Sequence, residues 1–294
     1  MATIGFVGLG TMGLAMARNL VNGGHTVIGF DPSGAAMEDH LRNGGQSSLS
    51  PAEAAKTADI VITMLPNGKI VRHAIFGKGG VIEEIQNSAL LIDMSTIHPS
   101  DTDDIRKDLA AKQIAMVDAP VGRTSVEAAA GKSLFMVGAE QVDLERARPI
   151  LECMGDTIID CGGPGKGSRM KIVNNLMTTS LNVLTAQVLT FSDATGLDRD
   201  LAVRVMNGTA AGRGHMSTTY PAKVLKGDLT PAFMIDLAKK DLDIALALSQ
   251  QLGVSLSMPM QAESIYADAQ QVGRGSQDWT AIYDMLHKNQ FPSA

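Results

Sequence analysis

Short apolar runs alternate with longer stretches of helical periodicity through the first half of the chain. Strands are expected at Thr3–Val7, Thr26–Phe30, Asp59–Leu65, Ala89–Met94, Ala115–Asp118, Leu134–Val137 and Thr157–Asp160. Strands that alternate with helices are typical of a parallel sheet covered on both faces. One helix has a clear start signal, because Ser50 can cap it, Pro51 takes its first position and Glu53 completes a capping box. This half therefore predicts an α/β domain with a mainly parallel sheet.

The pattern changes after Asp160. Residues 162–167 form a glycine-rich loop, and almost everything beyond it has helical periodicity. The expected helices are Ser168–Ala194, Leu201–Met206, Met216–Lys226, Met234–Leu252, Pro259–Val272 and Asp278–His287. We therefore expect an α/β domain at 1–162, followed by an all-α domain at 163–294.

The composition is that of an ordinary globular protein. A chain of 294 residues exceeds the usual size of one compact core, and 45% hydrophobic with 19% charged residues argues against disorder. The net charge of -6 provides no general attraction to nucleic acid or to an anionic membrane, so neither is an expected partner. An anionic substrate would need local cationic side chains.

Two further features bear on location and on metals. Cys153 and Cys161 are too few for a disulfide framework, and Met1–Val7 leads directly into a strand without a signal-peptide pattern, so a cytoplasmic location is expected. Amide and hydroxyl side chains interrupt the longest apolar helical stretch, at 172–191, which favours a packed helix over a membrane span. The six histidines lack metal-ligand spacing, so no metal site is expected.

A glycine motif follows the first expected strand and opens a helix. Gly8, Gly10 and Gly13 have the G-x-G-x-x-G spacing that allows a tight turn, close approach of a diphosphate and close helix packing. Thr11 and Met12 then lie at the helix N-terminus, where free N–H groups can bind the phosphates. We predict dinucleotide binding here; a purely structural glycine turn is the alternative.

An acidic residue, Asp31, ends the second expected strand. In dinucleotide-binding domains a carboxylate at this place accepts hydrogen bonds from the ribose hydroxyls of NAD, whereas it would repel the additional phosphate of NADP. The next residues, Pro32, Ser33 and Gly34, supply no compensating cation. The sequence predicts NAD as the cofactor, unless Asp31 is only a turn residue before proline.

Two loops follow the third and fourth expected strands. Leu65, at the end of the third expected strand, and Pro66 open the first loop, and Thr96 belongs to the second. Ligands of open α/β sheets bind at the carboxyl ends of the strands. We therefore expect these residues on the nicotinamide side of the cofactor, with ordinary loop and cap chemistry as the alternative.

A polar stripe runs along the long helix that follows the glycine-rich loop. Lys171, Asn174, Asn175 and Thr178 have i, i+3, i+4 and i+7 spacing on an otherwise apolar helix. A solvated face would more naturally carry several charged residues than one lysine among amides. We predict a substrate-facing cluster in which Lys171 donates a proton to a carbonyl oxygen as hydride arrives. The asparagines would supply hydrogen-bond donors.

Two more cationic positions are candidates for binding. Gly122, Arg123 and Thr124 follow the strand at Ala115–Asp118, and the planar fork of Arg123 suits an anionic head group. The alternative is an ordinary surface arginine. Lys240 could reach the cofactor, although adjacent lysines often form only a solvated face.

These residues together resemble a known family. The segments that carry the resemblance are Gly8–Leu20, Asp93–Thr96, Asp118–Val121 and Lys171–Asn175. They are similar to the β-hydroxyacid dehydrogenases, which include 3-hydroxyisobutyrate dehydrogenase and tartronate semialdehyde reductase. The resemblance spans nearly the whole chain. It implies a Rossmann-type domain joined to an all-helical substrate domain, a catalytic Lys171, a cofactor contact for Lys240, and a homodimer or homotetramer built through the helical part.

One departure from the family concerns the expected substrate. After Pro-Val the family usually has Ser-Gly-Gly, whereas this chain has Gly122 to Ser125. This segment, with Asn207–Gly212 and Pro231–Ala238, is most similar to members that reduce a three-carbon sulfonate aldehyde with NADH. A reductase of tartronate, succinate or methylmalonate semialdehyde, or a 3-hydroxyisobutyrate dehydrogenase, remains the alternative enzyme. A catalytically silent NAD-binding sensor is the alternative of another class.

Overall fold

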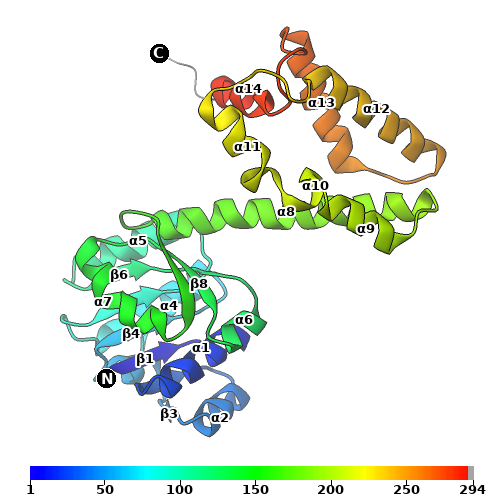
Figure 1. The fold of residues 1–294 in the computed structure, drawn as a ribbon. Helices are drawn as coiled ribbons and strands as arrows, with labels where there is room; N and C mark the ends of the chain where they lie inside the picture. The colour runs from blue at the N-terminus through cyan, green and yellow to red at the C-terminus, as the bar shows by residue number, and fades with distance from the viewer. Residues whose placement is uncertain (291–294) are drawn as a thin grey trace. The chain divides into compact units, whose positions relative to one another are not determined.

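The computed structural model describes residues 1–290, apart from the side chains of Asp241, Ile244, Ala247 and Leu248. Residues Met1–Leu176 form one compact unit, and a second begins at Met177 (Figure 1). The division falls inside the long helix α8 (Lys166–Ala194). The expected domain limit at residue 162 lies in the loop before this helix and stays a prediction.

The first unit is built on a parallel sheet of six strands in the order β3-β2-β1-β4-β5-β6. Its strands are β1 (Thr3–Val7), β2 (Thr26–Phe30), β3 (Gln46–Ser47), β4 (Ile60–Thr63), β5 (Leu90–Asp93) and β6 (Ala115–Asp118). The order reverses between β1 and β4, and such a switch point is where open α/β sheets bind ligands. The predicted α/β class is confirmed. The strand β3 was not predicted, because its two residues are exposed and carry no apolar pattern.

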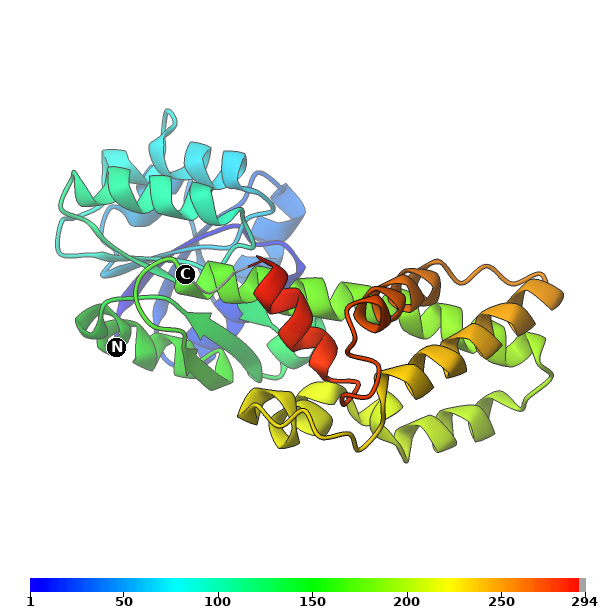
Figure 2. The same cartoon turned by 90° about the horizontal axis from the view of Figure 1, so that it is seen from above.

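Helices cover both faces of this sheet. They are α1 (Thr11–Asn22), α2 (Gly34–Arg42), α3 (Pro51–Ala55), α4 (Gly68–Phe76), η1 (Val81–Glu83), α5 (Pro99–Ala110), α6 (Ser125–Ala129) and α7 (Gln141–Glu152). One buried cluster joins the sheet to α1 and α7 through residues such as Met16 and Leu144. A second cluster joins the other face to α4 and α5 through residues such as Ile75 and Leu109. Figure 2 shows α4, in cyan, and α5, in turquoise, on one side of the strands.

A second, smaller sheet follows. It contains β7 (Val121–Gly122), β8 (Ser133–Val137) and β9 (Gly155–Asp160), with β7 antiparallel to β8 and β8 parallel to β9. We expected a single mainly parallel sheet, with a loop at 120–125. The antiparallel β7 forms because the chain turns back after Asp118, which pairs with Gly138 in an isolated bridge.

The second unit is helical. After α8 come α9 (Arg199–Asn207), α10 (Ala210–Arg213), η2 (His215–Ser217), α11 (Thr219–Ala222), η3 (Val224–Lys226), α12 (Ile235–Gln251), α13 (Ser257–Gln271) and α14 (Ala281–Gln290). Asp198 caps α9, since its side chain accepts a hydrogen bond from the backbone N–H of Leu201. A small buried cluster that includes Ile235 and Met285 packs α12, α13 and α14 together. The predicted all-α class of this part is confirmed.

One predicted helix, Met216–Lys226, is wrong. The chain there forms η2, α11 and η3 in succession, because Thr218 and Lys223 leave helical geometry with ψ values of -81° and -102°. Pro221 lies inside this stretch, and a proline removes a backbone donor and clashes with the preceding turn of a continuous helix. Among the described helices, none has the length and apolar character needed to cross a membrane.

Candidate active site

The glycine turn between β1 and α1 has the geometry that a bound diphosphate requires. Gly8 has a φ of +102°, and a Cβ there would lie 2.3 Å from the carbonyl oxygen of Met64. A Cβ on Gly13 would lie 2.0 Å from the carbonyl oxygen of Gly8, so the helix packs directly on the turn. A Cβ on Gly10 would meet no atom within 4 Å. The turn is therefore closed at its first and third glycines and open at the second, where a phosphate can approach the N–H groups of Thr11 and Met12.

Asp31 ties the end of β2 to this turn. Its Oδ2 accepts a hydrogen bond from the backbone N–H of Leu9, and its Oδ1 accepts one from Ser33, both at 2.8 Å. A carboxylate oxygen can accept two hydrogen bonds, so the partly exposed carboxylate can also accept from ribose hydroxyls.

A cavity of about 400 Å³ lies beside the turn and was not foreseen from the sequence. Gly8, Phe30, Pro32, Leu65 and Ile70 give it apolar walls that fit a flat aromatic base. The cavity is also lined by His73, Lys78 and residues of the 49–51 segment. Lys78 therefore brings a cation to the cavity that Pro32 also lines. The residues directly after Asp31 in the sequence, Pro32 to Gly34, supply no cation.

The loops after β4 and β5 are joined by buried hydrogen bonds. Asp93 Oδ1 accepts from the Thr63 hydroxyl at 2.8 Å and from the backbone N–H of Ser95 at 3.1 Å. The Ser95 hydroxyl oxygen in turn accepts from the backbone N–H of Leu65 at 2.9 Å. These bonds fix Leu65 relative to the loop that holds the exposed Thr96. Burial raises the pKa of Asp93 to about 6. Pro66, next to Leu65, is exposed.

The carboxylate of Asp118 holds the first turn of α8. Oδ1 accepts a hydrogen bond from the backbone N–H of Gly165 and Oδ2 accepts one from Ser168, both at 2.7 Å. Burial raises the pKa of Asp118 to about 6, and the negative charge of Asp93 raises it further. Asp93, Ser95 and Asp118 were not predicted as functional residues, although both aspartates lie at or next to the ends of predicted strands.

Lys171 lies one turn after Ser168 in α8. Its side chain is half-buried, and burial lowers the pKa of its ammonium group. Asn174 Nδ2 donates to Asn175 Oδ1 at 3.3 Å, so the two amides lie side by side on the next turn. Thr178 follows in α8 but belongs to the second unit. A lysine whose ammonium group has a lowered pKa gives up its proton more readily. Beside two amides, it can act as a general acid near a carbonyl group.

Arg123 has intramolecular partners in this structure. Nη1 donates to Asp156 Oδ1 at 2.5 Å and to the backbone oxygen of Lys132, and Nη2 donates to Thr157 Oγ1 at 3.0 Å. Its backbone has a φ of +70°, immediately after Gly122 ends β7. A role in head-group binding stays a prediction, and it must be compatible with this ion pair.

Thr124 and Lys240, two further candidates, lie in different units. Thr124 begins α6, where it forms a capping box with Glu127. Lys240 lies on α12, next to Lys239, which pairs with Asp243 at 2.9 Å and Glu263 at 2.7 Å. Their predicted substrate and cofactor contacts remain predictions.

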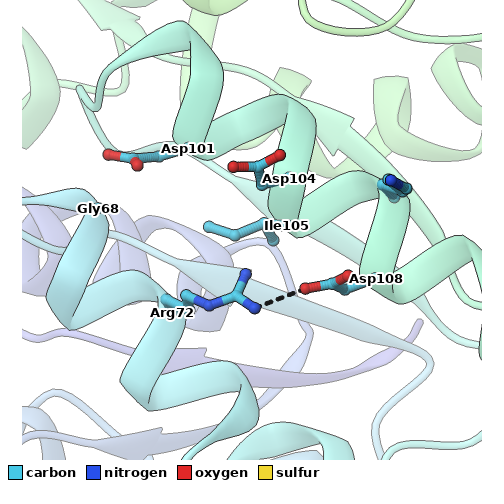
Figure 3. A pocket seen from close by; sticks show the side chains of 7 residues that line it. Gly68, Arg72, Asp101, Asp104, Ile105 and Asp108 are labelled. Carbon is cyan, nitrogen blue, oxygen red and sulfur yellow. Dashed lines mark hydrogen bonds and ion pairs between the residues drawn. The ribbon is translucent and has the colours of Figure 1, made fainter.

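A second cavity, of about 270 Å³, lies between α4 and α5 (Figure 3). Asp101, Asp104 and Asp108 line it, and Arg72 pairs with Asp108 at 2.6 Å. Its three aspartates outnumber the cations Arg72 and Lys107, which does not favour an anionic substrate or a dinucleotide, so we do not assign it to the active site. Within residues 1–290, no group of three or more acidic, histidine or cysteine side chains is arranged to hold a metal ion.

Two family models match the chain in succession. The model of the NAD binding domain of 6-phosphogluconate dehydrogenase matches residues 3–163. The model described as NAD-binding of NADP-dependent 3-hydroxyisobutyrate dehydrogenase matches residues 165–286. NAD(P)-binding domains are therefore present, while the two descriptions leave the choice between NAD and NADP open.

Curated relatives match over nearly the full length. The 3-sulfolactaldehyde reductase of Escherichia coli (strain K12) is 48% identical over 97% of this chain and 96% of its own length. The 2-(hydroxymethyl)glutarate dehydrogenase of Eubacterium barkeri is 34% identical over 95% of this chain and 93% of its own. The mitochondrial 3-hydroxyisobutyrate dehydrogenase of Mus musculus is 31% identical over 98% of this chain and 88% of its own.

Solved structures show the same architecture. The 3-hydroxyisobutyrate dehydrogenase of Mycobacterium tuberculosis, solved with L-serine, superposes with a TM-score of 0.68 at 33% identity, covering 97% of this chain and 99% of that one. An imine reductase of Myxococcus stipitatus, with NADP+, has a TM-score of 0.88 at 17% identity over 97% and 99% of the two chains, which shows a shared fold alone. From the two family models and these full-length relatives, the chain belongs to the β-hydroxyacid dehydrogenase family of oxidoreductases.

Proposed function

We propose that the protein reduces 3-sulfolactaldehyde to 2,3-dihydroxypropane-1-sulfonate with NADH, as a step of sulfoquinovose degradation. The observation that carries the proposal is the 48% identity, over 97% of the chain, to the E. coli 3-sulfolactaldehyde reductase. The hydroxyisobutyrate dehydrogenases stand at 31% to 34% identity over similar lengths. Residues 122–125, which depart from the usual Ser-Gly-Gly of the family, support a substrate other than that of the average member.

The glycine turn and the adjoining cavity support the cofactor part of the proposal. Gly8, Gly10 and Gly13 shape a turn that is open only where a diphosphate would lie. The bound cofactor supplies the hydride. Leu65, Pro66 and Thr96 would hold its nicotinamide end, with Leu65 fixed by the Ser95 hydroxyl.

Lys171 is the proposed proton donor. Burial lowers the pKa of its ammonium group, which makes the ammonium a stronger acid than an exposed lysine. It would protonate the carbonyl oxygen as the hydride adds to the carbonyl carbon, and it would stabilise negative charge that develops on that oxygen. Asn174 and Asn175 would orient the substrate through their amide N–H groups, with Thr178 on the following turn. Lys240 is proposed to contact the cofactor.

The sulfonate group is proposed to bind at Gly122, Arg123 and Thr124. Within residues 1–290, Asp156, Thr157 and the Lys132 carbonyl take three of the five N–H donors of Arg123, all on Nη1 and Nη2. Nε and the second hydrogen of Nη2 form an edge that can donate to two oxygens of a sulfonate. Arg123 can therefore bind an anion without giving up Asp156.

A carboxylate semialdehyde is the second candidate substrate. The relatives named as hydroxyisobutyrate or hydroxymethylglutarate dehydrogenases favour it, and an arginine fork binds a carboxylate as well as a sulfonate. The direct test is incubation with NADH and 3-sulfolactaldehyde, followed by mass spectrometry of the product. We expect stoichiometric 2,3-dihydroxypropane-1-sulfonate, and failure to form it would refute the proposed function.

We also propose that the protein is a homodimer or homotetramer that associates through its helical part. Leu181 and Val183, in the part of α8 that belongs to the second unit, are 43% and 47% exposed in the single chain, and neighbouring exposed apolar side chains can mark a surface that a partner covers. Sedimentation equilibrium should give a multiple of the 30.9 kDa chain mass. A monomer at micromolar concentration would contradict this proposal.

A further inference from the structure

Asp118 joins three separate segments of the first unit. Its backbone pairs with Gly138 at the end of β8, where the Gly138 N–H donates to the Asp118 carbonyl oxygen at 2.8 Å. Its carboxylate accepts two hydrogen bonds from Gly165 and Ser168 at the start of α8. One residue at the end of β6 therefore connects the large sheet, the small sheet and the long helix.

The start of α8 packs closely against the backbone at this junction. A Cβ on Gly138 would lie 2.7 Å from Asp118 Oδ1 and 2.6 Å from the backbone nitrogen of Gly167. A Cβ on Gly167 would lie 2.3 Å from the carbonyl oxygen of Met136. Asp118 and Ser168 are only 2% and 3% exposed. The start of α8 is thus fixed against both sheets by backbone contacts and by one carboxylate.

Lys171 follows Ser168 by three residues, so the two lie on the same side of the helix. A shift or tilt of the first turn of α8 is transmitted to Lys171 through the helix backbone. Proton donation is sensitive to such shifts, because an error of about 1 Å in the placement of a reacting group can cost roughly 100-fold in rate.

We propose that Asp118 is a positioning residue for the reduction: by holding the first turn of α8, it places Lys171 for proton transfer. This inference rests on the proposed role of Lys171 and adds a residue that contacts neither substrate nor cofactor. Asp118 acts through its two hydrogen bonds, so an amide in its place retains one acceptor but presents a donor to the other N–H group.

The surroundings of Asp118 indicate that a neutral replacement can fold. Among the described residues, the titratable groups that interact with it are Asp93 on β5, Cys161 before α8 and Arg169 on α8. Arg169 is paired with Asp103 at 2.6 Å, at the surface. Burial raises the pKa of Asp118, which means that the folded protein favours the uncharged side chain, relative to the charged one, more than water does. Asp118→Asn should therefore remain folded at neutral pH.

The test is a double-mutant cycle between Asp118→Asn and Lys171→Ala, with Asp103→Asn as the matched control. The control breaks the surface pair of Arg169 at the same end of α8 and leaves the buried hydrogen bonds in place. We expect Asp118→Asn to lower kcat by roughly 10-fold or more with NADH affinity nearly unchanged, while Asp103→Asn has little effect. In the Lys171→Ala background, Asp118→Asn should change kcat by less than about 2-fold, because the group that it positions is gone.

The outcomes separate this inference from the proposed function. If Lys171→Ala is strongly impaired and Asp118→Asn lowers kcat by the same factor in both backgrounds, Asp118 does not act through Lys171 and only this inference falls. If Lys171→Ala turns over normally, the proposed proton donor and this inference fall together. Should Asp118→Asn not fold, Asp118→Ser takes its place in the same cycle, with the same two criteria.

Discussion

The carboxylate of Asp31, at the end of β2, accepts a hydrogen bond from the backbone N–H of Leu9 in the glycine turn, with 2.8 Å between Oδ2 and N. The residue thus has a structural task besides its proposed contact with the cofactor ribose. Asp31→Asn preserves an acceptor for Leu9, whereas Asp31→Ala removes it. Comparing the two variants separates the loss of charge from the loss of the turn.

We predict that the unaltered enzyme prefers NADH and that both Asp31 variants narrow this preference. Losing a charge-assisted hydrogen bond costs about 1.5–3 kcal/mol, or roughly 10- to 150-fold in kcat/KM for NADH. Asp31→Ala should have a lower kcat/KM for NADH than Asp31→Asn, because it also removes the hydrogen bond to the glycine turn. Steady-state kinetics with both cofactors measures this, and equal kcat/KM for NADH and NADPH in the unaltered enzyme would refute the preference.

Lys78 should matter for NADPH more than for NADH. It lines the same cavity as Pro32, so it can offset part of the repulsion between Asp31 and the additional phosphate. In the Asp31→Ala background, Lys78→Ala should lower kcat/KM for NADPH several-fold and leave NADH nearly unaffected. Lys69→Ala is the control, since Lys69 is exposed on α4, just before the turn that holds Lys78, and does not line the cavity. Equal effects on both cofactors would remove Lys78 from cofactor selection.

The rate of reduction should depend on the protonation of Lys171. Lys171→Ala is expected to lower kcat by at least ~100-fold, the usual cost of losing a positioned general acid, with NADH binding preserved. Burial lowers the pKa of Lys171. As pH rises, kcat for aldehyde reduction should therefore decline at a lower pH than that at which an exposed lysine loses its proton. The decline has this sign because reduction needs the ammonium form. A pH profile with the same inflection in Lys171→Ala would assign the titration to another group.

Asp93 should make stability depend on pH in the opposite way from a surface carboxylate. Its folded pKa, raised by burial to about 6, exceeds the ordinary value of 3.8, so its favourable contribution is present at low pH and is lost as pH rises through about 6. The shift corresponds to about 3 kcal/mol at most. The Tm of Asp93→Asn minus the Tm of the unaltered protein should therefore be more positive at pH 7.5 than at pH 4.5. An unchanged Tm difference would show that the buried carboxyl is not linked to folding.

Arg123 should affect anionic substrates selectively. Arg123→Ala is expected to lower kcat/KM for an anionic aldehyde by about 10- to 150-fold and to affect a neutral short aldehyde much less. Arg123→Lys should restore only part, because lysine lacks the planar fork. Asp156→Asn is the companion variant, since it removes the ion pair while leaving the guanidinium. If Arg123→Ala impaired both aldehydes equally, Arg123 would serve the fold of the small sheet and not the head group.

Local sequence signals predicted the elements whose pattern is complete within the segment itself. The strand at Thr3–Val7 and the helix start with Ser50 as N-cap and Pro51 at its first position appear in the structure as the sequence predicts. The full capping box does not form, because the Glu53 side chain accepts from the backbone N–H of Leu49 and not of Ser50. The helix expected at Met216–Lys226 is wrong because Thr218 and Lys223 leave helical geometry in a stretch that contains Pro221. Strand β7 was missed because its two residues form a strand only by pairing with Phe135 and Leu134.

Site residues could be predicted where they belong to a motif of fixed spacing. They could not be predicted where segments distant in the sequence meet in the fold. The glycine turn and Asp31 are linked by a motif of fixed spacing, and the structure brings them together at Leu9. Lys78, in the turn after α4, lines the same cavity as Pro32, which is 46 residues earlier in the sequence. Likewise, Asp118 is one acidic residue among 31 in the sequence until the fold brings α8 to it. Burial and long-range hydrogen bonds, which create these relationships, have no local sequence signal.

The most direct test of the proposed activity is a comparison of kcat/KM for 3-sulfolactaldehyde, tartronate semialdehyde, succinate semialdehyde and methylmalonate semialdehyde with the same enzyme preparation and NADH. We predict the highest kcat/KM for 3-sulfolactaldehyde, by a factor of at least about 10, which corresponds to 1.4 kcal/mol of transition-state discrimination. A higher kcat/KM for any of the carboxylate semialdehydes would contradict the sulfonate assignment and leave the family assignment unchanged.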